Sequence, residues 1–181
     1  FKGFTVTLAH TIAKVAGSIS RSSVLTGAKV AIFKNKSITL SSIQDYWKGR
    51  SGYQQWPWAA TTGTIPVYTQ SGKSGNLFVE KSQNANSDLP YIQQVDNLAL
   101  IMYRPNKDLA TFGIDNHDVA LVWQDSLYDE VTEYGKWVIA REGDSYVAVL
   151  RHCTDQIEGV YSCNDQDGQL WACIVGNQDM Y

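Results

Sequence analysis

The sequence predicts an all-β protein, an antiparallel β-sandwich of about nine or more strands with at most one or two short helices. Aromatic residues make up 12% of the chain and charged residues only 18%, a composition that suits half-buried pleated surfaces. Short apolar runs recur along the chain, each bounded by Gly, Asn, Asp or Pro. No linker or internal repeat divides residues 1–181, so we expect a single sandwich domain.

Nine runs are predicted strands because each is rich in β-branched or aromatic residues. They cover residues 4–10, 29–34, 64–70, 76–81, 98–104, 119–124, 136–141, 145–151 and 170–176. The clearest hairpin joins the runs 136–141 and 145–151, because Gly143 between them can supply the positive φ of a tight turn. Both faces of this hairpin are apolar, so we expect it to lie inside a sheet rather than at an edge.

Helical signals are few. Residues 7–19 fit a 3.6-residue period through Leu8, Ile12 and Val15, but their β-branched content leaves helix and strand both open. A short helix is predicted for residues 126–135, with Ser126 as its N-cap and Gly135 as the residue that ends it.

Charge and motif content exclude several functions. A net charge of -3 offers no basic field, so we expect no nucleic-acid partner. No apolar run approaches the ~20 residues that cross a bilayer, so we expect no membrane insertion. The chain has no phosphate-binding loop, dinucleotide fingerprint or metal-ligand spacing, so we expect no cofactor and no metal. It begins at Phe1 without a leader pattern, and we expect a fragment of a longer chain.

The cysteines and one sequon indicate an oxidising compartment. Cys153 and Cys163 flank a polar, turn-rich segment, and a disulfide between them would close a loop of about ten residues. Cys173 lies in an apolar run, where a free thiol would be a small core residue. Asn35 begins an Asn-Lys-Ser glycosylation triplet. The expected location is extracellular or at the cell surface.

His117 lies in an acidic segment with Asp115 and Asp118. The histidine could act as an acid or base, or the oxygens could contact Ca²⁺. A polar turn that leads into the following strand explains the same residues, and we favour the turn.

Aromatic and amide side chains crowd residues 46–103. Flat rings beside amide groups are what a neutral or weakly acidic glycan requires, although large aromatics also fill sandwich cores. The candidate ligand-binding residues are Trp56, Trp58, Gln54, Gln55, Tyr68 and Gln70. In an extended strand Trp56 and Trp58 would share one face, and Pro57 would place that strand at an edge or a bulge.

The blocks "GYQQWPW" with "YTQSG", and "KWVIAREGDSYVAV", resemble a large group of secreted proteins whose layout is similar to heparinase II/III-type polysaccharide lyases. The resemblance covers about residues 40–181 and implies a C-terminal β-domain that follows a helical toroid. The sequence departs from that pattern at Gln70, where relatives carry a histidine, and in the segment before Pro90, which lacks an expected Trp-Gly. Both departures remove groups from a carbohydrate site.

Two functions follow from these observations. The first is an extracellular module, not catalytic on its own, that binds glycans or assembles with copies of itself in a matrix or filament. The alternative is the β-domain of a polysaccharide lyase that contributes to a cleft for a uronate polysaccharide. Such a lyase needs a base and a cation that neutralises the carboxylate, and the candidates are His117, Tyr53 and Arg104.

Overall fold

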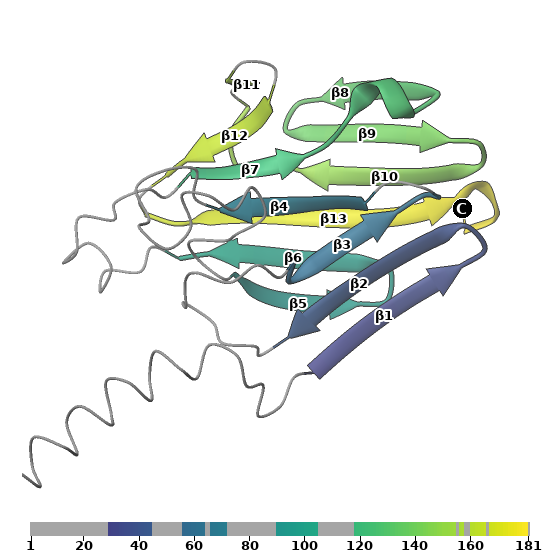
Figure 1. The fold of residues 1–181 in the computed structure, drawn as a ribbon, viewed down its shortest axis with the longest axis horizontal. Helices are drawn as coiled ribbons and strands as arrows, with labels where there is room; N and C mark the ends of the chain where they lie inside the picture. Colours follow the sequence, from purple (N-terminus) through teal and green to yellow (C-terminus); the bar gives the residue numbers. More distant parts are fainter. Residues whose placement is uncertain are drawn as a thin grey trace, which may run out of the picture.

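The computed structural model is a sandwich of two antiparallel β-sheets (Figure 1). It describes residues 29–44, 56–63, 66–71, 90–104, 118–154, 156–157, 160–165 and 167–180. Regular structure in these residues consists of thirteen strands and two 3₁₀ turns, η2 (Asp125–Leu127) and η3 (Gln178–Met180). The predicted fold class is therefore confirmed.

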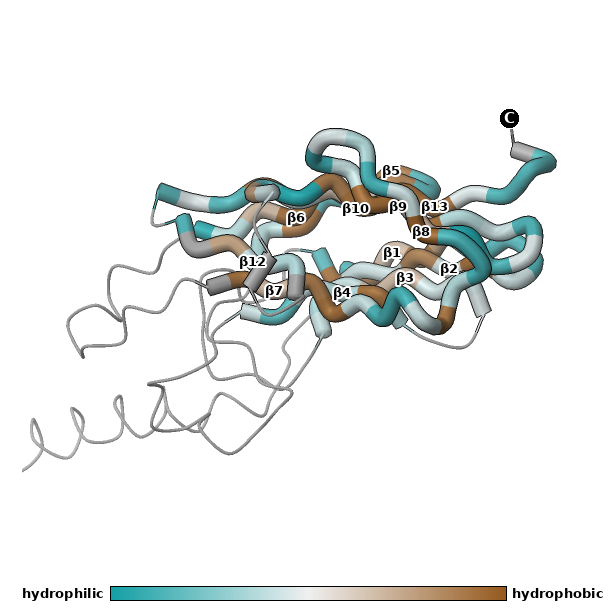
Figure 2. Tube along the Cα trace, turned by 90° about the horizontal axis from the view of Figure 1, so that it is seen from above, coloured by the Kyte–Doolittle hydropathy of each residue, from teal (hydrophilic) through white to brown (hydrophobic). Residues whose placement is uncertain are grey.

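Seven strands form one sheet and six form the other, and the two sheets lie as separate layers (Figure 2). The order across the seven-stranded sheet is β1 (Lys29–Asn35), β2 (Ile38–Gln44), β3 (Trp58–Thr61), β4 (Pro66–Ser71), β7 (Asp118–Val122), β12 (Val160–Asn164) and β11 (Gln156–Ile157). The order across the six-stranded sheet is β5 (Tyr91–Val95), β6 (Leu98–Tyr103), β13 (Gln169–Asn177), β10 (Ser145–Leu150), β9 (Trp137–Glu142) and β8 (Glu130–Tyr134).

Seven of the nine predicted strands fall on described residues, and all seven are present as β1, β4, β6, β7, β9, β10 and β13. The predicted strands at 4–10 and 76–81, and the ambiguous segment 7–19, lie outside the described residues. The hairpin of β9 and β10 is also confirmed, and each of its strands has a neighbour on both sides.

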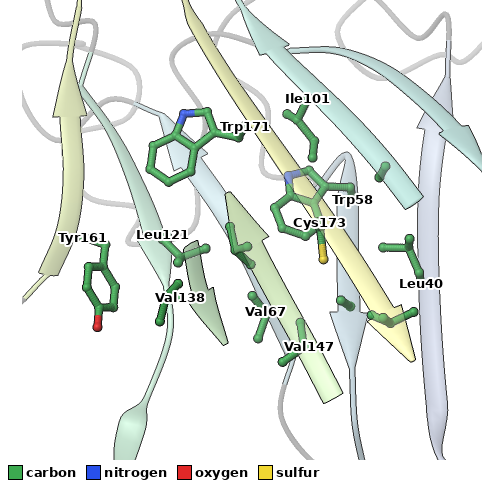
Figure 3. Close-up of a cluster of buried hydrophobic side chains, with 14 of the residues drawn as sticks. Leu40, Trp58, Val67, Ile101, Leu121, Val138, Val147, Tyr161, Trp171 and Cys173 are labelled. Carbon is green, nitrogen blue, oxygen red and sulfur yellow. The ribbon is translucent and has the colours of Figure 1, made fainter. Parts of the chain in front are cut away.

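The core fills the space between the inner faces of the two sheets. Trp58, Val67 and Leu121 point inward from the seven-stranded sheet and meet Ile101 and Trp171 of the six-stranded sheet (Figure 3). Both indoles are only 1% exposed. Burial of a side chain this large contributes roughly 2–3 kcal/mol, so these two residues anchor the packing of the sheets.

One buried polar contact joins the sheets where β2 faces β5. Ser42 Oγ donates to Gln94 Oε1 at 2.7 Å, and Gln94 Nε2 donates to the backbone oxygen of Leu40 at 3.1 Å. Both polar side chains occupy inward positions of their strands, with exposures of 2% and 7%. They interrupt the apolar alternation there, which explains why neither β2 nor β5 was among the predicted strands.

Tight two-residue turns close four hairpins. In each turn the first residue has a positive φ, the backbone geometry that such connections need. These residues are Lys36 (φ 48°), Asp96 (φ 49°), Gly135 (φ 58°) and Gly143 (φ 58°). The turn predicted at Gly143 is therefore confirmed.

The short helix predicted at 126–135 is wrong. Ser126 lies inside η2 and makes no cap, since the residue at the cap position is Gln124, without a side-chain cap bond. The following residues form β8, which pairs with β9 and includes the β-branched Val131 and Thr132. Pairing with β9 supplies the backbone hydrogen bonds of β8. The local sequence of residues 126–135 does not show that this partner strand is present, so it could not indicate a strand. Gly135 begins a hairpin turn instead of ending a helix.

A disulfide links the two sheets at one end of the sandwich. Cys153 follows β10 and is bonded to Cys163 in β12, across a sequence separation of 10 residues. A loop of this size contributes up to ~3 kcal/mol to stability. Cys173 is a free, fully buried thiol whose pKa is raised by burial. The predicted pairing and the predicted core thiol are both confirmed.

Substitution of Gly143 by alanine is expected to lower the free energy of unfolding by about 1–2 kcal/mol. An added Cβ meets nothing within 4 Å, so the cost arises from the left-handed backbone alone. Gly135→Ala shares the same φ and the same open surroundings and is expected to lose the same amount.

Chemical denaturation measures both values, with the exposed Asp144→Ala as a control that changes stability by less than about 0.5 kcal/mol. Unchanged stability of both glycine variants would show that these turns adopt another geometry.

Candidate functional site

The two tryptophans of the candidate glycan site are separated by the sheet. Trp58 begins β3 and points into the core, where it is 1% exposed. Trp56, by contrast, is 41% exposed and stacks on Tyr68, with ring centroids 4.5 Å apart and planes inclined by 25°. Tyr68 lies between the inward-facing Val67 and Thr69 on β4, so it belongs to the outer face of the seven-stranded sheet.

Pro57 lies between the two tryptophans, just before β3. Its carbonyl oxygen accepts a hydrogen bond of 2.7 Å from the Ile43 backbone N–H. The strand itself is flanked by β2 and β4, so of the two predicted positions, edge or bulge, the edge is wrong. The prediction of a shared face is also wrong, because the regular alternation starts only at Trp58.

Trp58 is a core residue and not a surface for stacking a ligand. Its Nε1–H donates to Thr69 Oγ1 at 2.7 Å, and that hydroxyl lies 2.8 Å from the Tyr103 hydroxyl. Trp58 and Thr69 come from the seven-stranded sheet and Tyr103 from the six-stranded sheet. This hydrogen-bonded group therefore satisfies a buried indole while it aligns the two layers.

Trp56, Tyr68 and Gln70 form the remaining candidate surface. Tyr68 and Gln70 are two residues apart on β4 and share its outer face. Tyr68 is 7% exposed, and burial raises the pKa of its hydroxyl, which stays protonated at neutral pH. Gln70 is half-buried beside it. Chemically, the surface offers one indole face together with an amide.

Of the other candidate residues, Gln54, Gln55, Tyr53 and His117 lie outside the described residues. Arg104 follows β6 and is exposed, and its guanidinium carbon lies 5.9 Å from the centroid of the Tyr91 ring. The lyase hypothesis therefore stays a prediction.

An ionic cluster that joins the buried Arg151 to the exposed Glu133 lies at the end of the sandwich that carries the disulfide. Arg151 is 1% exposed, and its Nη2 donates to Glu133 Oε2 at 2.8 Å. Its guanidinium carbon lies 4.6 Å from the Tyr161 ring centroid, and the Tyr161 hydroxyl donates to Glu133 Oε1 at 2.9 Å. Burial and this bond to Glu133 raise the pKa of Tyr161 to about 12. The cluster ties β8 and β10 to β12.

This cluster was not predicted from the sequence, although a signal for it was present. Arg151 continues the alternation of Val147 and Val149, which face the core, so it occupies an inward position. A charged residue at such a position indicates an ionic or hydrogen-bonding partner.

His152 and Asp165 lie beside the disulfide. The side-chain ligand atoms of His152, Cys153 and Cys163 lie within 4.8 Å of one another. His152 Nδ1 accepts the Leu170 N–H at 3.2 Å, so its Nε2 carries the proton and donates to Asp165 at 2.9 Å. That bond lowers the pKa of Asp165. With both sulfurs bonded to each other, this group braces the chain and is not arranged to hold a metal.

The sequon lies in the turn between β1 and β2. Asn35 ends β1 and is half-buried, whereas Lys36 and Ser37 are exposed. Ser37 Oγ lies 2.7 Å from Ser145 Oγ. Glycosylation at Asn35 stays a prediction.

Comparison with known proteins gives no relative. A scan of family models matches no family, and searches of curated proteins and of solved structures find no significant match. In the part of the chain that the structure describes, no helix has the length and apolar character that a membrane crossing requires.

Substitution of Thr69 by valine is expected to cost about 1–3 kcal/mol in unfolding free energy. Thr69 is 0% exposed, and a valine of equal shape would leave the buried Trp58 N–H without its acceptor. Thr39→Val is the matched control, because that threonine is half-exposed on the outer face of β2.

Equilibrium denaturation of the two variants compares the losses. Equal stability of the two variants would contradict a role for the Trp58 hydrogen bond.

Proposed function

We propose that this β-sandwich is an extracellular module that binds glycans through the exposed face of Trp56 and has no catalytic activity of its own. The observation that supports this proposal is the stacking of the Trp56 indole, which is 41% exposed, on Tyr68. One face of the indole contacts Tyr68, and the other face is left for solvent or a ligand. Exposure of a large aromatic ring in this arrangement is typical of binding surfaces.

Stacking on Tyr68 holds the Trp56 indole in one orientation, which favours the binding of a sugar. Contact with Tyr68 restricts the indole, which reduces the conformational entropy that binding would otherwise cost. The C–H face of a pyranose can pack on the free indole face. Gln70 shares the outer face of β4 with Tyr68, and a side-chain amide is a group that can hydrogen-bond to sugar hydroxyls.

The class of glycan follows from charge. Trp56, Tyr68 and Gln70 carry no positive charge, and the chain has a net charge of -3. A highly anionic polymer would require a basic surface for its affinity. Neutral or weakly acidic glycans therefore fit this surface best.

The proposed extracellular location is supported by two features. The Cys153–Cys163 disulfide is of the kind that persists in oxidising compartments. The sequon at Asn35 lies in a hairpin turn whose next two residues are exposed.

A second candidate is the β-domain of a polysaccharide lyase. The observation that favours it is Arg104, an exposed guanidinium beside Tyr91 that could neutralise a uronate carboxylate. A full-length lyase would produce an unsaturated uronate that is detectable by its ultraviolet absorbance. We propose that the chain of 181 residues alone produces none.

Substitution of Trp56 by alanine is expected to weaken glycan binding by about tenfold or more, because the stacking face is lost. Trp56→Phe keeps an aromatic ring and should retain much of the affinity. Leu127→Ala is the matched control, since Leu127 is also 41% exposed but lies in η2.

An array of neutral and uronate-containing oligosaccharides first identifies a ligand, and calorimetry then compares the variants. The proposal would be contradicted if no oligosaccharide on the array bound, or if Trp56→Ala and the wild type bound the ligand with equal affinity.

A further inference from the structure

The outer face of the six-stranded sheet is apolar across its width. The strand registers place a first row of side chains on this face, consisting of Gln93, Leu100, Ala172, Leu150, Trp137 and Tyr134. The second row consists of Val95, Leu98, Ile174, Ala148, Ile139 and Thr132. We refer to these two rows as the outer apolar face.

Several members of this face are open to solvent. Val95 is 62% exposed, Leu100 is 44% exposed and Tyr134 is 79% exposed. Met102 and Leu170, which pair with each other beside the first row, are 37% and 47% exposed. These five residues are the majority of the nine large apolar side chains that are exposed among the described residues. Exposure is therefore concentrated on one face.

The strand sequences are typical of a sheet that is buried on both faces. β6 reads LALIMY and β10 reads SYVAVL, with apolar residues at inward and outward positions alike. Such continuous apolar runs are typical of strands that are buried on both sides. The outer face of the seven-stranded sheet is different, because it alternates in the usual way with polar residues such as Thr39, Ser41 and Thr61.

Charge is nearly absent from the outer apolar face. Neither row contains a charged side chain. Charged residues border the two rows: Arg104 lies over the Tyr91 ring beside Met102, and Arg141 pairs with Glu130, whose Oε2 is 3.3 Å from its Nε. The two rows do not select a highly charged partner, and they meet the same rows of a second copy without charge repulsion.

From these observations we propose that the outer apolar face binds a second copy of this chain, sheet against sheet. An antiparallel sheet packs well on another such sheet, with about 10 Å between layers and strands inclined by about 30°. Six strands about 4.8 Å apart, over about five residues of each, give a footprint on the order of 500 Å² per copy. Two copies then bury about 1,000 Å², which is the lower limit for a biological interface and typical of weak, reversible association.

Association through the β8 edge of this sheet is disfavoured. This strand carries Glu130 and Glu133, and charged residues on an edge discourage the addition of another strand. A dimer with two-fold symmetry brings the same patch of both copies together, so the assembly stops at two copies.

This inference is independent of the glycan site, because Trp56 and Tyr68 belong to the other sheet.

Sedimentation velocity over a wide range of concentrations tests the proposal. The wild type is expected to dimerise reversibly, and Leu100→Lys is expected to raise the dissociation constant by about a hundredfold or more, because each dimer would bury two unpaired charges. Ile32→Lys is the matched control: Ile32 is 67% exposed on a strand of the other sheet, and its replacement should leave the dimer unchanged. Gln93→Leu extends the first row and should tighten association. Circular dichroism and thermal unfolding establish that each variant is folded.

Three outcomes overturn the proposal. A wild type that remains monomeric and binds an apolar dye would leave the face open for a different partner. A monomer that binds no dye would show that another segment of the same chain covers it. A dimer that tolerates Leu100→Lys but dissociates with Ile32→Lys would place the contact on the other sheet.

Discussion

The contact between the inner faces of the two sheets determines where every other side chain points. Successive residues of a strand face opposite sides, so burial of Trp58 and Trp171 between the layers assigns their neighbours to the outer faces. Buried polar contacts fix the alignment, because a slip of one residue would leave Thr69 or Gln94 without its partners. Both surfaces proposed to bind other molecules follow from this packing.

The sequence was sufficient for the fold class, most of the described strands, the disulfide and the Gly143 turn. It failed where tertiary partners override local pattern. Gln94 interrupts the alternation of β5 because it bonds to β2, and β8 is a strand because it pairs with β9. Trp56 and Trp58 could not be separated from the sequence alone, since the sequence does not show that β3 begins only at Trp58. Arg151 was detectable in principle as a charge at an inward position.

The two proposed surfaces lie on opposite layers of the sandwich (Figure 2). A pair of copies joined through the outer apolar face would leave Trp56 of each copy on the far side, free to bind. Two weak sugar sites held in one assembly gain affinity on a polymer by effective concentration. The outer apolar face would form the dimer, and the Trp56 indole of each copy would bind the glycan. The two surfaces can thus serve one function together, although a single sugar site binds weakly.

Hydroxyl-radical footprinting at rising protein concentration tests the central claim most directly, because it reports the exposure of individual side chains. We predict that Met102 and Trp137 lose reactivity as copies associate, whereas Trp56 retains it. Unchanged reactivity of Met102 and Trp137 under conditions of association, or protection of Trp56 in their place, would contradict it.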